Sequence, residues 1–318
     1  MSFKKIGIVE SSSFSKRAID ILKKIGRVYL LGKGDLESFL SDKEIIFIRL
    51  KHYIDSSFLD IAPKLKYICT PTTGLTHLDV DEIKRRNIKV ISLRGEKAFL
   101  SNIRATPEHF FGLVLSLLRN YRKNFLYSKN KSWDREKYKG NEIFGNQVGI
   151  IGFGRVGKIL AKYFHCFGAK VFFYDRDPEI EKKFNAIKLN SIKELISKTN
   201  IVLLCASYEK NNKHFFKKQY IDMLKNKFFI NGSRGELIDE EYLIKKIKDN
   251  HCKGIALDVI SNENNATNNL NKFIELVKER RNFILTPHIG GATFESMKKT
   301  EEFIALKIVN YINNFDSS

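Results

Sequence analysis

Cysteine is scarce in this chain, and its four cysteines are too far apart to form the motifs of zinc sites or disulfide-rich domains. They are Cys69, Cys166, Cys205 and Cys252, and no two of them form a Cys-x-x-Cys pair. Each stands in an apolar or strand-like context, so we expect buried, free thiols, as in proteins of a reducing compartment such as the cytoplasm. We expect no metal site.

Long apolar runs are also lacking. No stretch approaches the roughly 20 apolar residues that cross a bilayer. The most apolar helical run, residues 110–118, contains Gly112 and Ser116 and ends against Arg119. The first residues lead directly into a short apolar run without a small-residue cleavage site, so we expect no signal peptide. These absences favour a cytoplasmic protein with no membrane partner.

Acidic residues are too few to balance the basic ones, and the net charge is +20. One interpretation is a surface that binds nucleic acid or anionic lipid. The other is a lysine-rich surface without such a partner. Lysine pairs such as Lys23–Lys24 and Lys298–Lys299 are spread along the chain, without the long basic tract typical of nucleic-acid-binding tails. We favour the second interpretation and expect no nucleic-acid partner, although the positive charge would attract an anionic substrate.

The length of 318 residues, 43% of them hydrophobic, suits two domains with a core each. In the first hundred residues, short apolar runs alternate with segments of helical spacing such as 15–25 and 80–86. This alternation predicts parallel strands covered by helices. The expected strands are residues 6–9, 28–31, 45–48, 67–69 and 90–93.

A second alternation begins at residue 147, with expected strands at 148–152, 169–174, 201–205, 228–231, 254–259 and 283–286. Between the two series, residues 106–127 are expected to form one long helix with Pro107 in its first turn. The polar residues 128–140, with Trp133, would connect the domains. Residues 262–271 are expected to be a surface loop, and residues 292–313 a helix.

The strongest local motif is a glycine pattern after the strand expected at 148–152. Gly152, Gly154 and Gly157 form Gly-x-Gly-x-x-Gly at the opening of a helix. The first glycine allows a tight turn, the second lets the backbone approach a pyrophosphate, and the third lets the helix pack on its strand. The helix N-terminus adds unpaired N–H groups. We therefore expect a dinucleotide site that also includes Arg155 and Val156.

Asp175 follows the next expected strand, 18 positions beyond Gly157. A carboxylate in this position accepts hydrogen bonds from the ribose hydroxyls and repels a 2′-phosphate, which favours NAD over NADP as the cofactor. Arg176 follows directly and could instead accommodate a phosphate, so NADP stays the alternative.

Three further motifs follow strands of the second series, at the edge where open parallel sheets bind ligands. Arg234 stands in Asn-Gly-Ser-Arg-Gly, and a guanidinium on a glycine-flanked turn suits a carboxylate. Asp258 stands in Ala-Leu-Asp-Val, with Glu263 five positions later. His288 stands in Thr-Pro-His-Ile-Gly-Gly. Taken singly, a surface arginine or a structural histidine would be the simpler interpretation.

In this order and at these intervals, the motifs resemble those of the D-isomer-specific 2-hydroxyacid dehydrogenase family, which includes phosphoglycerate and formate dehydrogenases. The resemblance covers nearly the whole chain and includes Trp133-x-Arg135. It implies that Arg234 binds the substrate carboxylate, that His288 is the general acid and base, and that Glu263 orients His288. Such a reaction needs a base that titrates near neutrality, because hydride leaves a carbinol carbon only as its hydroxyl proton is removed.

The resemblance also implies further contacts. Asp258 would contact the nicotinamide carboxamide, and Thr73, Gly74 and Asn102 would bind the substrate. The remaining cofactor contacts would be Cys205, Ala206, Ser207, Gly232, Ser233, Gly290 and Gly291. The sequence departs from the family pattern in three places: Ile260-Ser261 replaces Phe-Glu, Cys205 replaces a histidine, and Thr76 replaces an aspartate of the glycine loop. The last departure leaves the substrate open.

These patterns predict an α/β protein of two doubly wound parallel-sheet domains with a cleft between them. Residues 1–101 and 291–318 would form a flavodoxin-like substrate domain, and residues 102–290 an NAD-binding Rossmann domain. The expected function is hydride transfer between NAD(H) and a small D-2-hydroxy or 2-keto acid, with phosphoglycerate and sugar-derived acids among the candidates. The alternative is an NAD(H)-binding regulatory or scaffold protein without turnover. As in relatives, a homodimer through the cofactor domain is expected.

Overall fold

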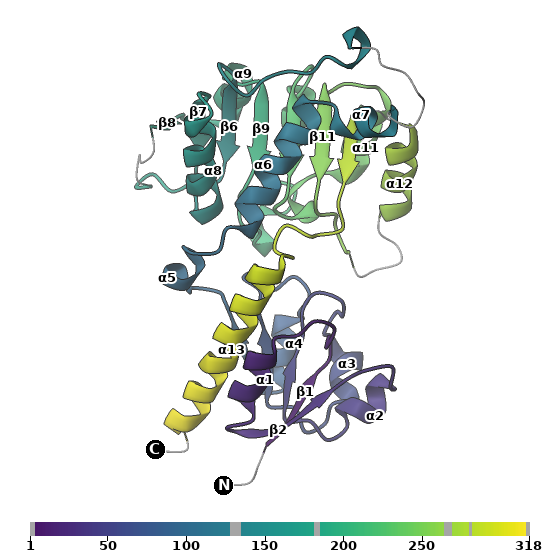
Figure 1. The fold of residues 1–318 in the computed structure, drawn as a ribbon, viewed down its shortest axis with the longest axis vertical. Helices are drawn as coiled ribbons and strands as arrows, with labels where there is room; N and C mark the ends of the chain where they lie inside the picture. The colour runs from purple at the N-terminus through teal and green to yellow at the C-terminus, as the bar shows by residue number, and fades with distance from the viewer. Residues whose placement is uncertain (1–3, 128–134, 181–184, 264–268, 280–281, 316–318) are drawn as a thin grey trace. The chain divides into compact units, whose positions relative to one another are not determined.

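The computed structural model describes residues 4–127, 135–180, 185–263, 269–279 and 282–315 (Figure 1). Contacts divide the chain into two compact units, Met1–Ile103 with Ala292–Ser318 (unit 1) and Arg104–Gly291 (unit 2). Each unit has its own sheet. Trp133 lies outside the described residues. The assignment of substrate binding to one unit and cofactor binding to the other stays a prediction.

The described part of unit 1 contains a five-stranded, entirely parallel sheet in the order β2-β1-β3-β4-β5. This is the flavodoxin-like doubly wound order, so the predicted fold of this unit is confirmed. Its strands are β1 Lys4–Ile8, β2 Gly26–Leu30, β3 Ile45–Phe47, β4 Tyr67–Thr70 and β5 Lys89–Ser92.

Helices cover both faces of this sheet, because its central strands are apolar on both sides. One face packs against α1, α5 and α13, and the other against α2, α3 and α4. Ser15, Asp35, Asp55 and Asp79 each cap the N-terminus of the helix that follows. The helices are α1 Lys16–Leu22, α2 Leu36–Leu40, α3 Ser56–Asp60, α4 Val80–Arg85, α5 Lys97–Leu100 and α13 Phe294–Phe315.

The described part of unit 2 contains a seven-stranded parallel sheet in the order β12-β11-β10-β9-β6-β7-β8. Renumbered from β6, this is the Rossmann order with one added strand, and the predicted fold is confirmed. The strand order reverses between β6 and β9, which is where such sheets bind ligands. The strands are β6 Gln147–Ile151, β7 Lys170–Tyr174, β8 Ile187–Lys188, β9 Ile201–Leu204, β10 Phe228–Asn231, β11 Gly254–Leu257 and β12 Phe283–Leu285.

One helix prediction in unit 2 is wrong. The single helix expected over residues 106–127 is two helices, because Asn120 adopts a left-handed φ of 52° and ends the first. The loop expected at 262–271 also ends earlier, since α12 begins at Leu270. The helices of unit 2 are α6 Ala105–Leu118, α7 Tyr121–Tyr127, η2 Glu136–Tyr138, α8 Arg155–Cys166, α9 Ile192–Lys198, η3 Lys210–Asn212, α10 Lys218–Asp222, η4 Gly235–Leu237, α11 Glu240–Lys248 and α12 Leu270–Glu279.

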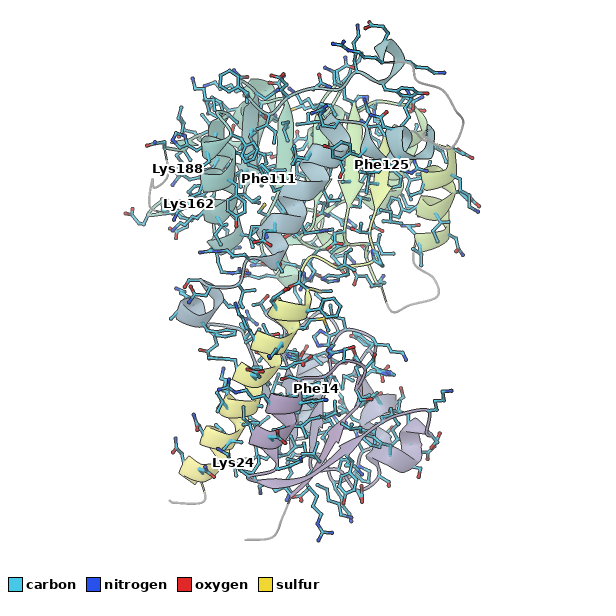
Figure 2. All side chains as sticks on the ribbon, viewed as in Figure 1. Phe14, Lys24, Phe111, Phe125, Lys162 and Lys188 are labelled. Carbon is cyan, nitrogen blue, oxygen red and sulfur yellow. The ribbon has the colours of Figure 1, made fainter. Side chains whose placement is uncertain are left out.

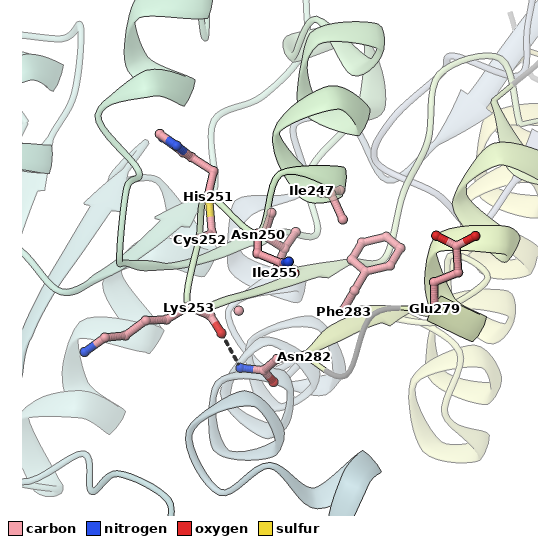
Figure 3. Close-up of a pocket in the computed structure, with 10 residues that line it drawn as sticks. Ile247, Asn250, His251, Cys252, Lys253, Ile255, Glu279, Asn282 and Phe283 are labelled. Carbon is pink, nitrogen blue, oxygen red and sulfur yellow. Dashed lines mark hydrogen bonds between the residues drawn. The ribbon is translucent and has the colours of Figure 1, made fainter.

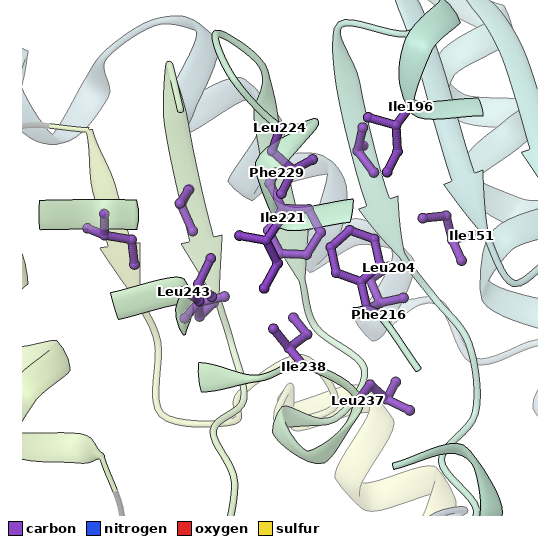
Figure 4. Packing of buried hydrophobic residues seen from close by; sticks show 14 of the residues in the cluster. Ile151, Ile196, Leu204, Phe216, Ile221, Leu224, Phe229, Leu237, Ile238 and Leu243 are labelled. Atoms are coloured by element: carbon purple, nitrogen blue, oxygen red, sulfur yellow. The ribbon is translucent and has the colours of Figure 1, made fainter. Parts of the chain in front are cut away.

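The sheet of unit 2 is buried on both faces. Successive residues of a strand point to opposite faces, so Leu204 and Phe229 enter one core while Leu203 and Ile230 enter the other. The first core, shown in Figure 4, lies under α9–α12 and contains the stacked rings of Phe216 and Phe229, 5.2 Å apart. The second lies under α6 and α8. These cores hold the strand ends in fixed register.

All four cysteines are free, but one expectation about them is wrong. Cys69 is buried in β4, whereas Cys166 is exposed because it ends α8 on the solvent side. Within the described residues, no group of three or more histidine, cysteine, aspartate or glutamate side chains is arranged to hold a metal ion. None of the helices in the described ranges is long and apolar enough to cross a membrane.

Candidate active site

The glycine loop lies at the carboxyl end of β6, where the strand order reverses. Gly152 has a φ of 92°, and a Cβ on it would lie 2.5 Å from the backbone nitrogen of Ala206. A Cβ on Gly157 would lie 2.4 Å from the carbonyl oxygen of Gly152. At Gly154, the N-cap of α8, a Cβ would meet no described atom within 4 Å. The loop therefore leaves space at a helix N-terminus, which suits a phosphate group.

Two arginines lie near this helix N-terminus. Burial lowers the pKa of Arg155, and the nearby charge of Arg104 lowers it further. Arg155 begins α8, and Arg104 precedes α6. Two guanidinium groups that interact at a helix N-terminus favour an anionic ligand. Arg155 belongs to the glycine motif and was predicted, whereas Arg104 belongs to no motif described above and was not.

Asp175 follows β7 and braces the glycine loop. Its Oδ2 accepts a hydrogen bond of 2.6 Å from the N–H of Phe153, and its Oδ1 accepts one of 3.0 Å from the N–H of Asp177. The neighbouring Arg176 donates to both carboxylate oxygens of Glu209. The cation that could have accommodated a 2′-phosphate is thus paired within the chain.

His288 and Glu263 are in direct contact. The Nδ1 of His288 lies 2.6 Å from Oε2 of Glu263, and both side chains are half-buried. Oε1 of Glu263 accepts a further hydrogen bond of 3.3 Å from the N–H of Ile260. A carboxylate at this distance fixes the proton of the neutral imidazole on Nδ1, so Nε2 carries the lone pair that can accept a proton. The sequence analysis predicted this pair from a resemblance, despite the altered residues around Glu263.

The backbone of His288 is held in an uncommon conformation, with a φ of 52°. Its N–H donates to the carbonyl oxygen of Asp258 at 2.8 Å. The carboxylate of Asp258 accepts from the N–H groups of Ile289 (2.9 Å) and Gly290 (2.8 Å). A Cβ on Gly290 would lie 2.9 Å from Oδ2 of Asp258, so the close approach requires glycine. Asp258 thus binds three consecutive N–H groups of the turn that carries His288.

Asp258 is 2% exposed and remains ionised. Burial raises the pKa of its carboxyl group, but hydrogen bonds from His109 and Thr286 outweigh this and hold the pKa below its ordinary value. The hydroxyl of Thr286 donates to Oδ1 at 2.6 Å, and Nε2 of His109 lies 3.2 Å from the same atom. Because the chain itself engages both oxygens, the expected contact of Asp258 with a nicotinamide carboxamide stays a prediction.

Arg234 lies in a turn after β10 that is braced by Asn231, a buried residue at the strand's end. Oδ1 of Asn231 accepts from the N–H of Ser233, and Nδ2 donates to the carbonyl oxygen of Arg234, both at 3.0 Å. A guanidinium nitrogen of Arg234 donates to the carbonyl oxygen of Ser233 at 2.7 Å. The sequence analysis did not single out Asn231; its signal was an amide side chain between an apolar strand and a glycine turn.

Arg234 and His288 share Glu263 as an electrostatic neighbour. Burial lowers the pKa of Arg234, while Glu263, Glu236 and Asp258 oppose that shift through their negative charge. The same Glu263 carboxylate contacts the imidazole of His288. The structure therefore brings a half-buried guanidinium, a carboxylate and an imidazole into one neighbourhood of unit 2. This arrangement can bind a carboxylate and transfer a proton close to it.

Two further glutamates hold the loop that carries Glu263, and the sequence analysis missed both. Oε1 of Glu240 accepts from the N–H of Ser261 at 2.6 Å, and Oε1 of Glu236 accepts from the N–H of Asn262 at 3.3 Å. Burial raises the pKa of Glu240. These contacts restrain the backbone of the loop just before Glu263.

The remaining predicted cofactor residues lie in α8, follow β9 or β10, or lie near His288. Ser233 donates its hydroxyl to the carbonyl oxygen of Ala206, which joins the two strand ends. A Cβ on Gly232 would lie 2.6 Å from the ring of Phe110. Burial raises the pKa of the Cys205 thiol. Others in this group, Val156, Ser207 and Gly291, lie in the same unit.

The predicted substrate residues Thr73, Gly74 and Asn102 belong to unit 1. Thr73 and Asn102 are exposed, and the carbonyl oxygen of Gly74 accepts a hydrogen bond of 2.9 Å from the hydroxyl of Thr72. Their contact with a substrate stays a prediction.

A separate pocket of about 440 Å³ lies at the amino ends of β11 and β12 (Figure 3). Asn282 there donates to the carbonyl oxygen of Lys253 at 2.6 Å. Burial raises the pKa of Cys252 in its wall to about 12, so this thiol is protonated and unreactive. The pocket is at the opposite end of the strands from Asp258 and His288, and is not part of their site.

Comparison with known proteins finds a family model and several relatives that match this chain. Residues 111–290 match the family model described as D-isomer specific 2-hydroxyacid dehydrogenase, NAD binding domain. The chain is 30% identical over 320 residues to a D-3-phosphoglycerate dehydrogenase of Haemophilus influenzae, covering 98% of this chain and 75% of that protein. It is 28% identical over 282 residues to a glyoxylate reductase of Thermococcus gammatolerans, covering 86% and 80%.

Solved structures share the fold. A D-lactate dehydrogenase of Aquifex aeolicus, complexed with NAD and lactic acid, matches with a TM-score of 0.82 and 24% identity over 98% of this chain and 96% of that one. An NAD-dependent formate dehydrogenase of Staphylococcus aureus, in complex with NAD, matches with a TM-score of 0.81 and 23% identity over 98% and 96%.

Proposed function

The chain belongs to the D-isomer-specific 2-hydroxyacid dehydrogenase family and is an NAD-dependent enzyme, and from this premise we propose that Arg234, Glu263 and His288 catalyse interconversion of a small D-2-hydroxy acid and its 2-keto acid. The observation that carries the proposal is the 2.6 Å contact between Glu263 and His288, with Arg234 close enough to interact with the same carboxylate.

The roles follow from the chemistry of each group. Arg234 binds the substrate carboxylate with its guanidinium, which the Asn231 turn holds in place. His288 moves a proton between its Nε2 and the substrate oxygen, and Glu263 stabilises the imidazolium that forms when His288 acts as base. A nicotinamide dinucleotide held by the glycine-loop residues would supply the hydride chemistry. Asp258 keeps the turn of His288 in position.

The residues of the glycine loop fit a dinucleotide. The space beside Gly154 and the arginines near α8 would hold the pyrophosphate, and Asp175 would hold a ribose. NAD is the cofactor of this family. Asp175 and the engaged state of Arg176 both support NAD over NADP.

The substrate is proposed only as a class. Three of the relatives named above act on phosphoglycerate, glyoxylate or lactate, and each of these acids carries a carboxylate beside the reacting carbon; the fourth acts on formate, which has only its carboxylate carbon. We propose a small 2-keto acid, with phosphoglycerate-derived and sugar-derived acids as candidates. Thr73, Gly74 and Asn102 would then select among them. A location in the cytoplasm stays a prediction.

We also propose a homodimer formed through unit 2. Phe144 and Phe167 are 74% and 51% exposed, and the ring of Phe111 on α6, the residue labelled in Figure 2, lies 4.8 Å from that of Phe167. Grouped exposed aromatic rings are typical of protein interfaces. If this surface is the interface, Phe167→Glu should convert a dimer into a monomer in light scattering. A wild-type monomer would contradict the proposal.

The alternative function is an NAD(H)-binding regulatory or scaffold protein without turnover. A panel of 2-keto acids, including glyoxylate, pyruvate and hydroxypyruvate, tested with NADH and NADPH, distinguishes the two. Turnover that His288→Ala abolishes supports the enzyme. Tight NADH binding without turnover of any acid would favour the alternative.

A further inference from the structure

We propose that His109 is a positioning residue for His288 and acts through the carboxylate of Asp258. His109 lies on α6 and belongs to none of the motifs discussed above. The inference rests on the proposed function for its catalytic consequence. Its structural part, the restraint of the turn at residues 286–290, can be tested without turnover.

The contacts of His109 show which of its neighbours accept a proton from Nε2. Its Nε2 lies 3.2 Å from Oδ1 of Asp258 and 3.2 Å from Oγ1 of Thr286. The hydroxyl proton of Thr286 is donated to Asp258, so both atoms that face Nε2 are acceptors. Nε2 of His109 must therefore carry a proton, and His109 is a donor to this cluster.

Oδ1 of Asp258 depends on that donor. It lies 3.2 Å from Nε2 of His109 and receives hydrogen bonds from the Thr286 hydroxyl, itself bonded to His109, and from the Ile289 N–H, while Oδ2 receives one from the Gly290 N–H. A carboxylate that is 2% exposed needs its donors, because a buried charge without partners is costly. Without His109 the Asp258 carboxylate would lose a donor that holds its orientation.

The turn of His288 depends in turn on Asp258. A left-handed φ at a residue other than glycine is strained and persists only where surrounding contacts fix it. At His288 those contacts come mainly from the backbone and side chain of Asp258. The Nδ1 of His288 meets Glu263 only while this turn is in place, and displacement of a catalytic group by about 1 Å can reduce a rate about 100-fold.

The test compares His109→Leu with His109→Gln. Glutamine keeps an N–H donor near the position of Nε2, whereas leucine keeps only the bulk. His165→Leu is the matched control, because His165 is an exposed histidine on α8 whose ring contacts Asn185, far from the turn of His288 in sequence. Three quantities are measured: kcat with the 2-keto acid that wild type reduces fastest, the Kd for NADH, and amide hydrogen exchange in residues 286–291.

We expect His109→Leu to lower kcat about 10- to 100-fold and to accelerate exchange of the Ile289 and Gly290 amides about 10-fold, with a change in NADH Kd below about 3-fold. His109→Gln should recover most of both losses, and His165→Leu should match wild type. Unchanged kcat and exchange in His109→Leu would overturn the inference, as would a glutamine variant no better than leucine. If wild type shows no turnover, the proposed function fails, while the exchange measurement still decides the role of His109.

Discussion

Arg176 and Glu209 form an ion pair in which one guanidinium nitrogen lies 3.0 Å from each carboxylate oxygen. Arg176 directly follows Asp175, so it is the basic group closest in sequence to the expected ribose site. Glu209 therefore removes a cation that could bind a 2′-phosphate and adds a negative charge nearby. Both side chains are more than a third exposed, so the pair contributes at most about 1 kcal/mol.

Glu209→Gln should weaken the preference for NADH over NADPH. Without Glu209, the guanidinium of Arg176 can contact the 2′-phosphate of NADPH. Because the ion pair contributes at most about 1 kcal/mol, the ratio of kcat/KM for NADH to that for NADPH should fall about 3- to 5-fold. Glu194→Gln is a suitable control, since Glu194 pairs with Lys198 on α9 at 2.7 Å. A ratio that is the same in Glu209→Gln and wild type would contradict this role.

Asp175→Ala should weaken NADH binding about 10-fold and reduce the preference for NADH over NADPH. The change removes both the carboxylate expected at the ribose and the acceptor for the Phe153 N–H. Asp175→Asn keeps an acceptor for that N–H but loses the charge. The asparagine variant should therefore lose selectivity for NADH over NADPH but remain more stable than the alanine variant. Fluorescence titration with each cofactor measures the Kd values; an unchanged Kd ratio in both variants would refute the assignment.

The fold was predictable because its signals are local. Buried strands of parallel sheets are short apolar runs. Where such runs alternate with segments whose apolar residues have helical spacing, the sequence predicts a parallel sheet covered by helices. Two errors show where this fails. The strand β8 was not predicted, because its two residues, Ile187 and Lys188, are too few to form a recognisable apolar run. The break at Asn120 depends on a single left-handed residue within an otherwise continuous helical pattern.

Within the candidate site, the sequence indicated residues in recognisable motifs and missed those that hold them. Glu240 and His109 act through contacts distant in sequence, with 21 positions between Glu240 and Ser261 and 177 between His109 and Thr286. No local period encodes such a contact. Only the tertiary arrangement of strand ends shows which polar side chains are buried donors or acceptors.

Glu263→Gln should lower kcat about 10- to 100-fold without altering NADH binding. The amide cannot stabilise an imidazolium as the carboxylate does, although it can still accept from Nδ1 of His288. Steady-state kinetics and NADH titration separate the two effects. Glu275→Gln, a change on α12, serves as control. Retention of full kcat by Glu263→Gln would show that another group orients His288.

Asn231→Ala should raise the KM for the 2-keto acid more than it lowers kcat. Its loss leaves the Ser233 N–H and the Arg234 carbonyl without their present partner, and the turn that positions the Arg234 guanidinium loosens. Each buried hydrogen bond contributes about 1 kcal/mol, so unfolding should require about 1–3 kcal/mol less free energy. Chemical denaturation measures the stability loss. A stable variant with unchanged KM would contradict the bracing role.

The pair of Arg49 and Glu301 in unit 1 gives a prediction about stability and pH. Glu301 is 1% exposed on α13, and its carboxylate accepts from the Arg49 guanidinium at 3.0 Å and from the Ser15 N–H at 2.8 Å. Burial raises the pKa of Glu301 above 4.5, and Arg49 and Ser15 oppose the shift. Glu301 therefore stabilises the folded protein fully at a pH below the pKa that its carboxyl group has in the unfolded chain. This contribution is lost as the pH rises through the higher pKa of Glu301 in the folded protein.

Arg49→Met removes the main counter-charge and should raise the pKa of Glu301 further. The buried carboxylate is then unpaired at neutral pH, and the free energy of unfolding should fall by about 3 kcal/mol at about pH 8. The loss should be smaller at about pH 5, where the carboxyl group is more fully protonated. Adding Glu301→Gln removes the titrating group, so the double variant should lose this pH dependence. Urea denaturation at both pH values measures these differences. An Arg49→Met loss of equal size at the two pH values would show that packing of the arginine, and not the charge of Glu301, accounts for the effect.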